Sequence, residues 1–388
     1  MTKLGVYLES SPEGGGTYQY NLSILDSLST FDSSFYIVYV FYLDRSWEKI
    51  LHNNFKKVHV KNPLFFRALG KLYKFLDKSK NGLRRSSMIF NPVISTINKS
   101  DCDLIIFPSQ DALSYQVNKK SLSTIHDLMH RYEPEFQEYK NGEYERREKH
   151  YALMCEFSDG ILVDSEIGKN HVIESYNLSS NKIFVLPFVP PTYLLSSKMV
   201  NVKQKYNLPE RYLFYPAQFW EHKNHLNLIE SFKILIQKGY DINLVLVGSK
   251  KNNFNKVIDK INRYKLSNRI FVLGYVNNDE MFSLYKNALM TIFVSLLGPT
   301  NIPVMEALTI GSPLICSNVY AMPDQVGDAA LLVDPKNPED ISNKIELLLN
   351  DKMLIADLIT KGKKKVENYT QMEFTHRLEN IIEKILNT

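Results

Sequence analysis

The chain has 388 residues, of which 44% are hydrophobic and 23% charged, and its net charge is +5. This length exceeds what one ordinary hydrophobic core organises, so we expect two globular domains. The small net charge disfavours a nucleic-acid-binding protein, and no apolar run is long enough to cross a membrane.

The N-terminal sequence and the cysteines indicate the compartment. The stretch "MTKLGVYLES" does not resemble a secretion signal. Cys102, Cys155 and Cys316 lie far apart in the sequence, which argues against disulfides and against a structural zinc site. We therefore expect a cytoplasmic protein.

The first half of the chain predicts strands that alternate with helices. Apolar segments rich in β-branched and aromatic residues are typical of buried parallel strands, and they occur at 4–10, 35–43, 102–109, 122–128, 160–165 and 182–191. Helical spacing of apolar residues predicts helices at 17–31 and 166–176.

A basic and aromatic stretch runs from residue 56 to residue 85. Lysine and arginine interleaved with phenylalanine, leucine and tyrosine suit an anionic membrane surface, so peripheral membrane contact is one hypothesis. The alternative is a solvated helix whose apolar side packs inward.

The alternation starts again after Pro190 and Pro191. Strands are expected at 212–219, 242–249, 269–276, 289–295, 312–318 and 329–335, and helices at 225–239, 278–288 and 303–310. Because the pattern occurs twice, the sequence predicts an α/β protein with two doubly wound parallel-sheet domains and a boundary near residue 190.

Four groups of residues at predicted strand ends are candidates for chemistry, because ligands bind beyond the carboxyl ends of parallel strands. The first is the glycine cluster Gly14, Gly15 and Gly16, between a strand and a helix. It allows a ligand to approach backbone N–H groups closely. A flexible turn is the alternative, and the spacing is not that of a dinucleotide-binding fingerprint.

The second group is "STIHDLMHRYEP", in which His126 and Asp127 follow a strand. An imidazole beside a carboxylate suits recognition of sugar hydroxyls or proton handling. Two alternatives stay open: a purely structural His126, and a metal site with His130 if both histidines lie on one helix.

The third group is Lys223 with Asn224, between a strand and a helix, where a lysine can neutralise a phosphate. The fourth is "LLGPTNIPVMEAL". Pro303 suits the first turn of a helix and Gly311 its end, with Asn301 or Ile302 at the cap.

The N-terminus of this short helix is predicted to bind an anion. Glu306, one turn into the helix, could accept two ribose hydroxyls, so the combination describes a nucleotide site. The alternative is that Glu306 only complements the helix dipole.

These motifs occur in a recognisable order. The glycine cluster, "IHDL", "KN" and "NIPVMEALTIGSPLICSNVYAMPDQVGDAALLVDP" together resemble retaining glycosyltransferases of family 4, which have the GT-B fold. The resemblance implies an acceptor-binding domain at 1–190 joined by a last helix at 370–388, and a donor-binding domain at 191–369.

The resemblance also implies roles for individual residues. His126, with Asp127 beside it, would contact the donor sugar, Lys223 would bind the diphosphate, and Glu306 would hold the ribose. Further donor contacts are implied for Gly15, Gly16, Gly274, Tyr275, Val276, Asn301 and Ile302.

Two positions depart from the family pattern. Gly298 stands where the family usually has an acid, and Gln218 stands where it usually has an arginine. Both are kept as candidate donor contacts, with Thr300 and Asn301 as substitutes for the missing acid. The variant resembles a subgroup of bacterial surface-polysaccharide transferases.

The resemblance implies transfer of a hexosyl unit, with retention, from a GDP- or UDP-linked sugar without a metal. GDP-mannose is the leading donor, and the acceptor would be a glycan or an undecaprenyl-diphosphate-linked oligosaccharide of O-antigen or capsule synthesis. The enzyme would be cytoplasmic or peripheral on the inner face of the membrane. Alternatives are a nucleotide-sugar epimerase or hydrolase of the same fold, and an inactive sugar-nucleotide-binding module.

Overall fold

The computed structural model describes residues 1–9, 15–61, 80–111, 113–298 and 300–388. The chain forms two compact units. The first comprises Met1–Leu128, Glu145–Pro187 and Gln371–Thr388, and the second comprises Met129–Tyr144 and Phe188–Thr370. The segment Met129–Tyr144 thus joins the second unit, although it lies within the range expected for the first domain.

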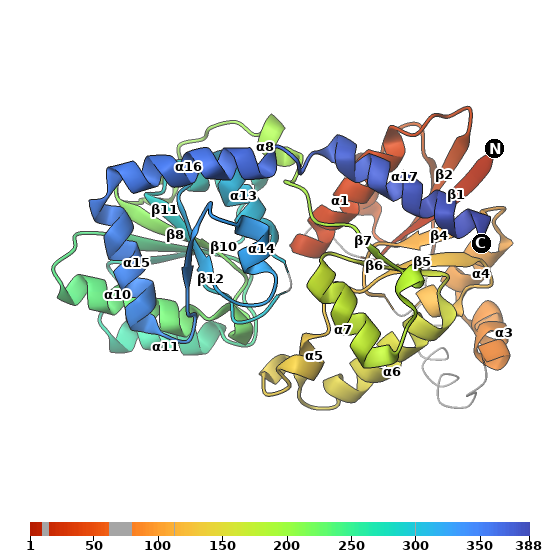
Figure 1. Cartoon of the computed structure of the whole chain (residues 1–388), viewed down its shortest axis with the longest axis horizontal. Coiled ribbons are helices and arrows are strands. Elements are labelled where there is room, and N and C mark those ends of the chain that lie inside the picture. Colours follow the sequence, from red (N-terminus) through yellow and green to blue (C-terminus); the bar gives the residue numbers. More distant parts are fainter. Residues whose placement is uncertain (10–14, 62–79, 112, 299) are drawn as a thin grey trace. The chain divides into compact units, whose positions relative to one another are not determined.

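The first unit is built on a seven-stranded parallel sheet with the order β3-β2-β1-β4-β5-β6-β7 (Figure 1). Its strands are β1 (Thr2–Leu8), β2 (Tyr36–Tyr42), β3 (Lys56–His59), β4 (Leu104–Phe107), β5 (Lys120–Thr124), β6 (Gly160–Val163) and β7 (Ile183–Val185). Its helices are α1 (Gly16–Ser29), α3 (Lys80–Phe90), α4 (Pro92–Lys99), α6 (Glu143–Phe157), α7 (Glu166–Tyr176) and α17 (Gln371–Asn387).

The basic stretch 56–85 is not one helix. Lys56–His59 forms strand β3, which pairs in parallel with β2, and α3 begins at Lys80. Residues 62–79 lie outside the described residues. The hypothesis of membrane contact concerns mainly these residues, so it stays a prediction.

The last helix, α17, returns to the first unit. Phe374, Leu378 and Ile382 on its inner side are buried, and Gln371 Nε2 donates to Ser27 Oγ of α1 at 2.8 Å. The helix therefore contributes to the hydrophobic core of the first unit, although the strands of that unit lie far from it in the sequence.

The second unit is built on a six-stranded parallel sheet with the order β10-β9-β8-β11-β12-β13. Its strands are β8 (Tyr212–Pro216), β9 (Asn243–Val247), β10 (Ile270–Gly274), β11 (Met290–Phe293), β12 (Leu314–Ser317) and β13 (Leu331–Val333). Its helices are α5 (Met129–Tyr132), α8 (Tyr193–Ser196), α9 (Val202–Tyr206), α10 (His225–Gln237), α11 (Phe254–Arg263), α12 (Asn278–Asn287), α13 (Ile302–Ile310), α14 (Met322–Val326), α15 (Pro338–Asn350) and α16 (Lys352–Val366).

Helices cover both faces of this sheet. Helix α10 packs on α15 and α11, and α13 packs on α16 and α12; in Figure 1, α13 and α16 lie above the sheet and α10 and α11 below it. The four inner strands β9, β8, β11 and β12 are buried along their whole length, which explains their apolar sequences, whereas the edge strands β10 and β13 are partly exposed. The prediction of two doubly wound α/β domains is confirmed.

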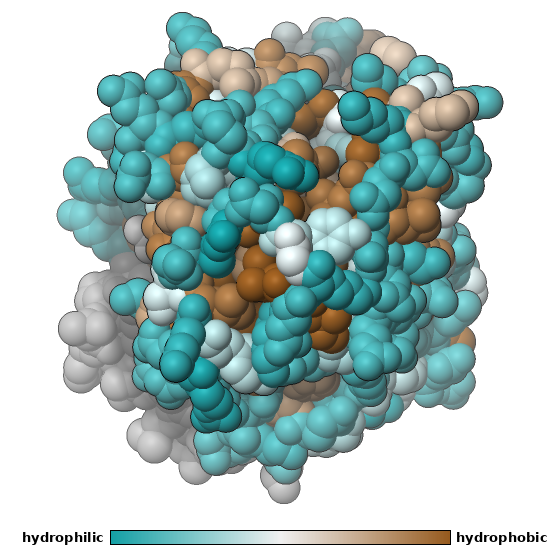
Figure 2. Space-filling model, turned by 90° about the vertical axis from the view of Figure 1, so that its left-hand side faces the viewer, coloured by the Kyte–Doolittle hydropathy of each residue, from teal (hydrophilic) through white to brown (hydrophobic). Residues whose placement is uncertain are grey.

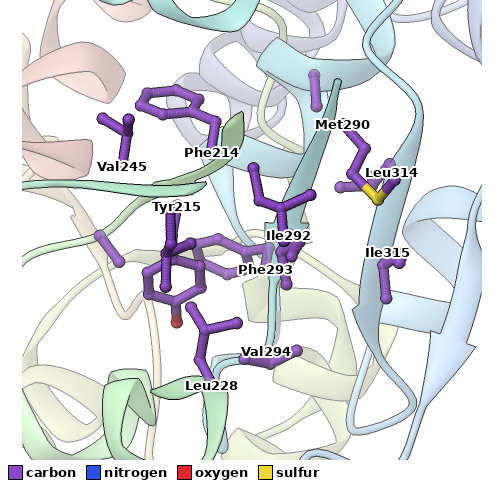
Figure 3. Close-up of a cluster of buried hydrophobic side chains, with 14 of the residues drawn as sticks. Phe214, Tyr215, Leu228, Val245, Met290, Ile292, Phe293, Val294, Leu314 and Ile315 are labelled. Carbon is purple, nitrogen blue, oxygen red and sulfur yellow. The ribbon is translucent and has the colours of Figure 1, made fainter. Parts of the chain in front are cut away.

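The core of the second unit is close to the strands that carry the candidate site. Tyr215 of β8 stacks near Phe293 of β11 with ring centres 6.0 Å apart, and Leu228 of α10 lies on the same side, whereas Phe214 points to the opposite face (Figure 3). The outer surface near α10 and α15 is mainly hydrophilic, with hydrophobic side chains in separate areas (Figure 2).

Candidate functional site

The strand order of the second sheet indicates where a ligand binds. The order reverses between β8 and β11, so the loops that follow these two neighbouring strands leave in opposite directions and open a crevice. The loop after β8 contains Gln218 and Lys223, and the loop after β11 contains Gly298 and Asn301. Two of the four groups singled out in the sequence therefore meet at one switch point.

Lys223 is fixed there by its backbone. A 3-10 turn, Glu221–Lys223, ends at Asn224, which has the left-handed backbone conformation (φ 60°). The Asn224 side chain is buried and donates to the carbonyl oxygens of Val294 (2.9 Å) and Pro335 (2.6 Å). The hydroxyl of the buried Tyr215 donates to the carbonyl oxygen of Lys223. This hydrogen bond connects the turn to the core of the unit.

The Lys223 ammonium group points at the loop after β11. Its Nζ donates to Asn301 Oδ1 at 3.1 Å and to Ser295 Oγ at 3.4 Å, and it lies 5.1 Å from the centre of the Phe293 ring. A lysine held this way, at a switch point, is suited to neutralise an anionic ligand.

Helix α13 begins at this point, as the sequence predicts, with Asn301 at its N-cap and Gly311 (φ 77°) just past its end. Its first turn leaves backbone N–H groups without intrahelical partners and carries a partial positive charge. The Asn301 backbone is itself clamped: its N–H donates to Gln325 Oε1 at 3.0 Å, and Gln325 Nε2 donates back to its carbonyl oxygen at 2.9 Å. The Asn301 N–H therefore already has a partner, and it is the side-chain oxygen of Asn301 that accepts from the lysine.

At position 298, both the backbone conformation and the neighbouring Asn301 side chain disfavour any residue with a Cβ atom. Its φ is 117°, and a Cβ atom at this position would lie 2.8 Å from Asn301 Nδ2. The Asn301 side chain thus occupies the space next to residue 298 and contacts Lys223. Thr300, the preceding residue in the chain, is half-buried, and its role as a substitute for the missing acid stays a prediction.

Glu306 has partners that the sequence did not predict. The Tyr193 hydroxyl donates to its Oε1 at 2.9 Å, and the Tyr285 hydroxyl donates to its Oε2 at 2.7 Å. Burial raises the pKa of the Glu306 carboxyl, and the two hydroxyls oppose that shift. A ribose could use only the lone pairs that the tyrosines leave.

The other expected donor contacts lie at the same edge of the sheet, where β8 and β10 end. Gln218 Oε1 accepts from Trp220 Nε1 at 3.0 Å. Gly274 has a positive φ of 75°, Tyr275 is 62% exposed, and Val276 is buried. The exposed Tyr275 ring is thus available for stacking, whereas Val276 contributes to the core.

The remaining candidates belong to the first unit. His126 and Asp127 follow β5; the His126 ring meets the Tyr20 ring edge-on at 5.1 Å, and Asp127 lies 3.8 Å from Arg147. Burial lowers the pKa of His126 to about 4, so the imidazole is neutral at physiological pH. Gly15 is the N-cap of α1 with φ 61°, and Gly16 begins the helix, whereas Gly14 lies outside the described residues.

The described part of the chain contains no group of three His, Cys, Asp or Glu residues placed to hold a metal. Helix α5 begins only at Met129, so His126 and His130 do not share a helix. Among the same residues, no helix is both long and apolar enough to span a bilayer.

Sequence reasoning missed several residues around Lys223 and Glu306. Ser295 contacts Lys223, and Tyr193 and Tyr285 contact Glu306. Gln325 contacts the Asn301 backbone, and Glu138 contacts His222, next to Lys223. Only Ser295 had a local signal, because it ends a predicted strand at the sheet edge. The others come from distant elements and have no pattern that points to the site.

The second unit matches a known family. Residues 199–365 match the model of glycosyl transferases group 1. The chain is 26% identical over 238 residues to O-antigen chain mannosyltransferase B of Escherichia coli, covering 60% of this chain and 62% of that protein. It is 28% identical over 226 residues to the capsular polysaccharide biosynthesis glycosyltransferase CapM of Staphylococcus aureus, covering 56% and 58%. The matches thus span less than two thirds of these relatives.

Solved structures resemble the whole chain. Sucrose-phosphate synthase of Thermosynechococcus elongatus superposes with a TM-score of 0.76 at 17% identity, covering 100% of both chains. HepE of Anabaena, solved in complex with UDP-glucose, superposes with a TM-score of 0.74 at 15% identity, again over 100% of both chains. The chain therefore has the GT-B fold of two Rossmann-like parallel-sheet domains, and its residues 199–365 match the model of glycosyl transferases group 1.

Proposed function

We propose that the protein is a retaining glycosyltransferase that moves a hexosyl unit from a nucleotide-diphosphate sugar to a hydroxyl of a glycan or lipid-linked oligosaccharide. The observation that carries this proposal is the arrangement at the switch point of the second sheet. Lys223 and the N-terminus of α13 converge there, and both favour an anion.

In the proposed reaction the bond between C1 of the sugar and the diphosphate oxygen breaks, and the acceptor oxygen bonds to C1 on the same face. The acceptor proton passes to the departing phosphate, so nucleoside diphosphate and the extended glycan are the products. Lys223 and the α13 N-terminus would stabilise the charge that develops on the leaving diphosphate. His126, neutral at physiological pH, would hydrogen-bond a sugar hydroxyl in this scheme, with Asp127 beside it.

The relatives suggest the class of donor and acceptor. Two of them carry the names O-antigen chain mannosyltransferase B and Serotype-specific mannosyltransferase WbdA, and CapM carries a name from capsular polysaccharide biosynthesis. On this basis we propose mannose from GDP-mannose as the first donor to test, with a UDP-sugar as the second because HepE was solved with UDP-glucose. Bacterial surface polysaccharide is the proposed product, and no metal is proposed.

A thermal-shift screen of the full chain against GDP-, UDP-, dTDP- and ADP-sugars tests donor binding. A ligand that binds only the folded state raises the melting temperature, and we expect one nucleotide class to do so. Absence of a shift with all four classes would contradict the proposed function. Release of nucleotide without any acceptor would instead indicate a hydrolase.

A further inference from the structure

One segment of the second unit comes from the middle of the first unit's sequence. Met129–Tyr144 lies between β5 and α6 in the chain, and both of its neighbours, Leu128 and Glu145, belong to the first unit. Its buried Met129, Phe136 and Tyr139 form a hydrophobic cluster with Leu297, in the loop after β11. The segment therefore packs against one of the two loops that form the lysine site.

Polar contacts join the same segment to the other loop. Glu138 Oε1 lies 2.6 Å from His222 Nδ1 and accepts from the His222 backbone N–H at 3.3 Å. The neighbouring Gln137 N–H donates to Glu221 Oε2 at 3.0 Å. His222 and Glu221 both belong to the 3-10 turn Glu221–Lys223. The segment therefore makes hydrogen bonds to the turn that carries the lysine.

Glu138 is suited to this role because it is buried and charged. Its side chain is 7% exposed. Burial by itself would raise the pKa of Glu138, but the hydrogen bonds from His222 outweigh this effect and hold the pKa below its usual value. A buried carboxylate with charge-assisted hydrogen bonds restricts its partners more strongly than a surface contact does.

The contacts continue from His222 to the lysine. The His222 carbonyl oxygen accepts from Leu296 N–H at 2.8 Å and from Ser295 Oγ at 3.3 Å. The Ser295 hydroxyl oxygen in turn accepts a hydrogen bond from Lys223 Nζ at 3.4 Å. A shift of His222 would therefore move both the backbone next to Lys223 and the serine that the ammonium group contacts.

We propose that Glu138 is a positioning residue for Lys223, and that the segment Met129–Tyr144 is a structural part of the donor site. This inference rests on the proposed function of Lys223 as the residue that binds the diphosphate. The segment would fix the lysine turn through His222, and the geometry of the turn would set how well the ammonium group meets the leaving group.

The test is a double-mutant cycle between Glu138→Ala and Lys223→Ala in the full chain. It is measured both as the affinity for GDP and UDP and as kcat/KM for the donor sugar. If Glu138 acts through Lys223, Glu138→Ala lowers these values by about 10- to 100-fold when the lysine is present. The same change then has almost no effect in the Lys223→Ala background, because the two effects are not additive. Glu138→Gln, whose carbonyl can still accept from His222, should retain more activity than Glu138→Ala.

A matched control removes a different contact of the same segment. Tyr320→Phe removes the 2.8 Å hydrogen bond from the Tyr320 hydroxyl to Glu133 Oε1 of the segment and keeps the ring. We expect this variant to lower the melting temperature without changing the affinity by more than about twofold, since the hydrogen bond it removes involves neither His222 nor the turn Glu221–Lys223.

The outcomes separate the two proposals. Equal losses from Glu138→Ala in both backgrounds would overturn the positioning role and leave a general structural one. Unchanged affinity and turnover in Lys223→Ala itself would instead overturn the proposed function of the lysine, and the positioning role with it.

Discussion

At the scale of single residues, the least expected feature is the surroundings of Glu306. The sequence places this carboxylate one turn into α13, and the structure confirms that position. Its two hydrogen-bond donors, Tyr193 and Tyr285, lie on α8 and α12. No local pattern could predict them, because they reach Glu306 only after the sheet and its helices have assembled.

Tyr285→Phe tests how far these hydroxyls stabilise the carboxylate. Removing one donor from a buried acceptor costs about 1–3 kcal/mol, so we expect the free energy of unfolding to fall by that amount and the pKa of Glu306 to rise further. Urea unfolding of the full chain measures the loss. In a Glu306→Gln background the loss should be smaller, and a loss of equal size there would contradict the account.

Gly298 is the second position where one residue decides local geometry. We expect Gly298→Ala to lower both stability and donor affinity, because its Cβ would lie 2.8 Å from Asn301 Nδ2 and would displace the side chain that contacts Lys223. Strained backbone of this kind costs about 1–3 kcal/mol.

Gly239→Ala is the matched control. Gly239 also has a positive φ, 86°, but a Cβ there would meet nothing within 4 Å. It should lose stability through backbone strain alone and keep its donor affinity, as measured by calorimetric titration with GDP or UDP. Equal affinity losses in both variants would show that Asn301 is not involved.

At the scale of elements, the sequence predicts those with a local signal well. Helix α7 has the predicted bounds, α10 ends at Gln237 within the predicted range 225–239, and α13 ends at Ile310, directly before Gly311 as predicted. β3 was missed because it is a four-residue edge strand in which two exposed lysines precede the partly buried Val58 and His59, so it has neither an apolar run nor an alternation. The place of Met129–Tyr144 was missed because it depends on contacts with a distant part of the chain.

The start of α10 gives this unit a pH dependence. His225 is completely buried between the Phe219 and Tyr215 rings, and burial lowers its pKa to about 3. The folded state keeps the imidazole neutral while the unfolded chain takes up a proton below about pH 6.5, so stability falls as the pH decreases from there toward 3.

From pH 7 to pH 5 this single group should remove about 2 kcal/mol of unfolding free energy. The variant His225→Phe keeps an aromatic ring beside Phe219 but has no titratable group. We expect its melting temperature to fall less than that of the wild type over the same pH range. An equal fall in both proteins would show that His225 does not control it.

At the scale of the whole molecule, the two strand orders explain why the motifs of the sequence are functional candidates. A doubly wound sheet opens a crevice where its strand order reverses, and the Lys223 and Asn301 loops flank that point in the second sheet. The sequence could predict the sheet and the motifs from apolar runs and glycine positions. It could not predict which strands become neighbours of β8, since strand order is set by packing of the complete unit.

The most direct test of the account is sugar transfer by Lys223→Ala. Wild type, Lys223→Ala and Lys238→Ala are compared for transfer from the donor found by thermal shift to a lipid-linked oligosaccharide. Lys238 carries the same charge in the same unit but pairs with Glu346 on α15. We predict that Lys223→Ala lowers the turnover rate by about 10²–10³-fold, the usual cost of removing one contact to a developing charge, while Lys238→Ala stays near wild type. Near-wild-type turnover by Lys223→Ala would contradict the central claim that this lysine stabilises the leaving diphosphate.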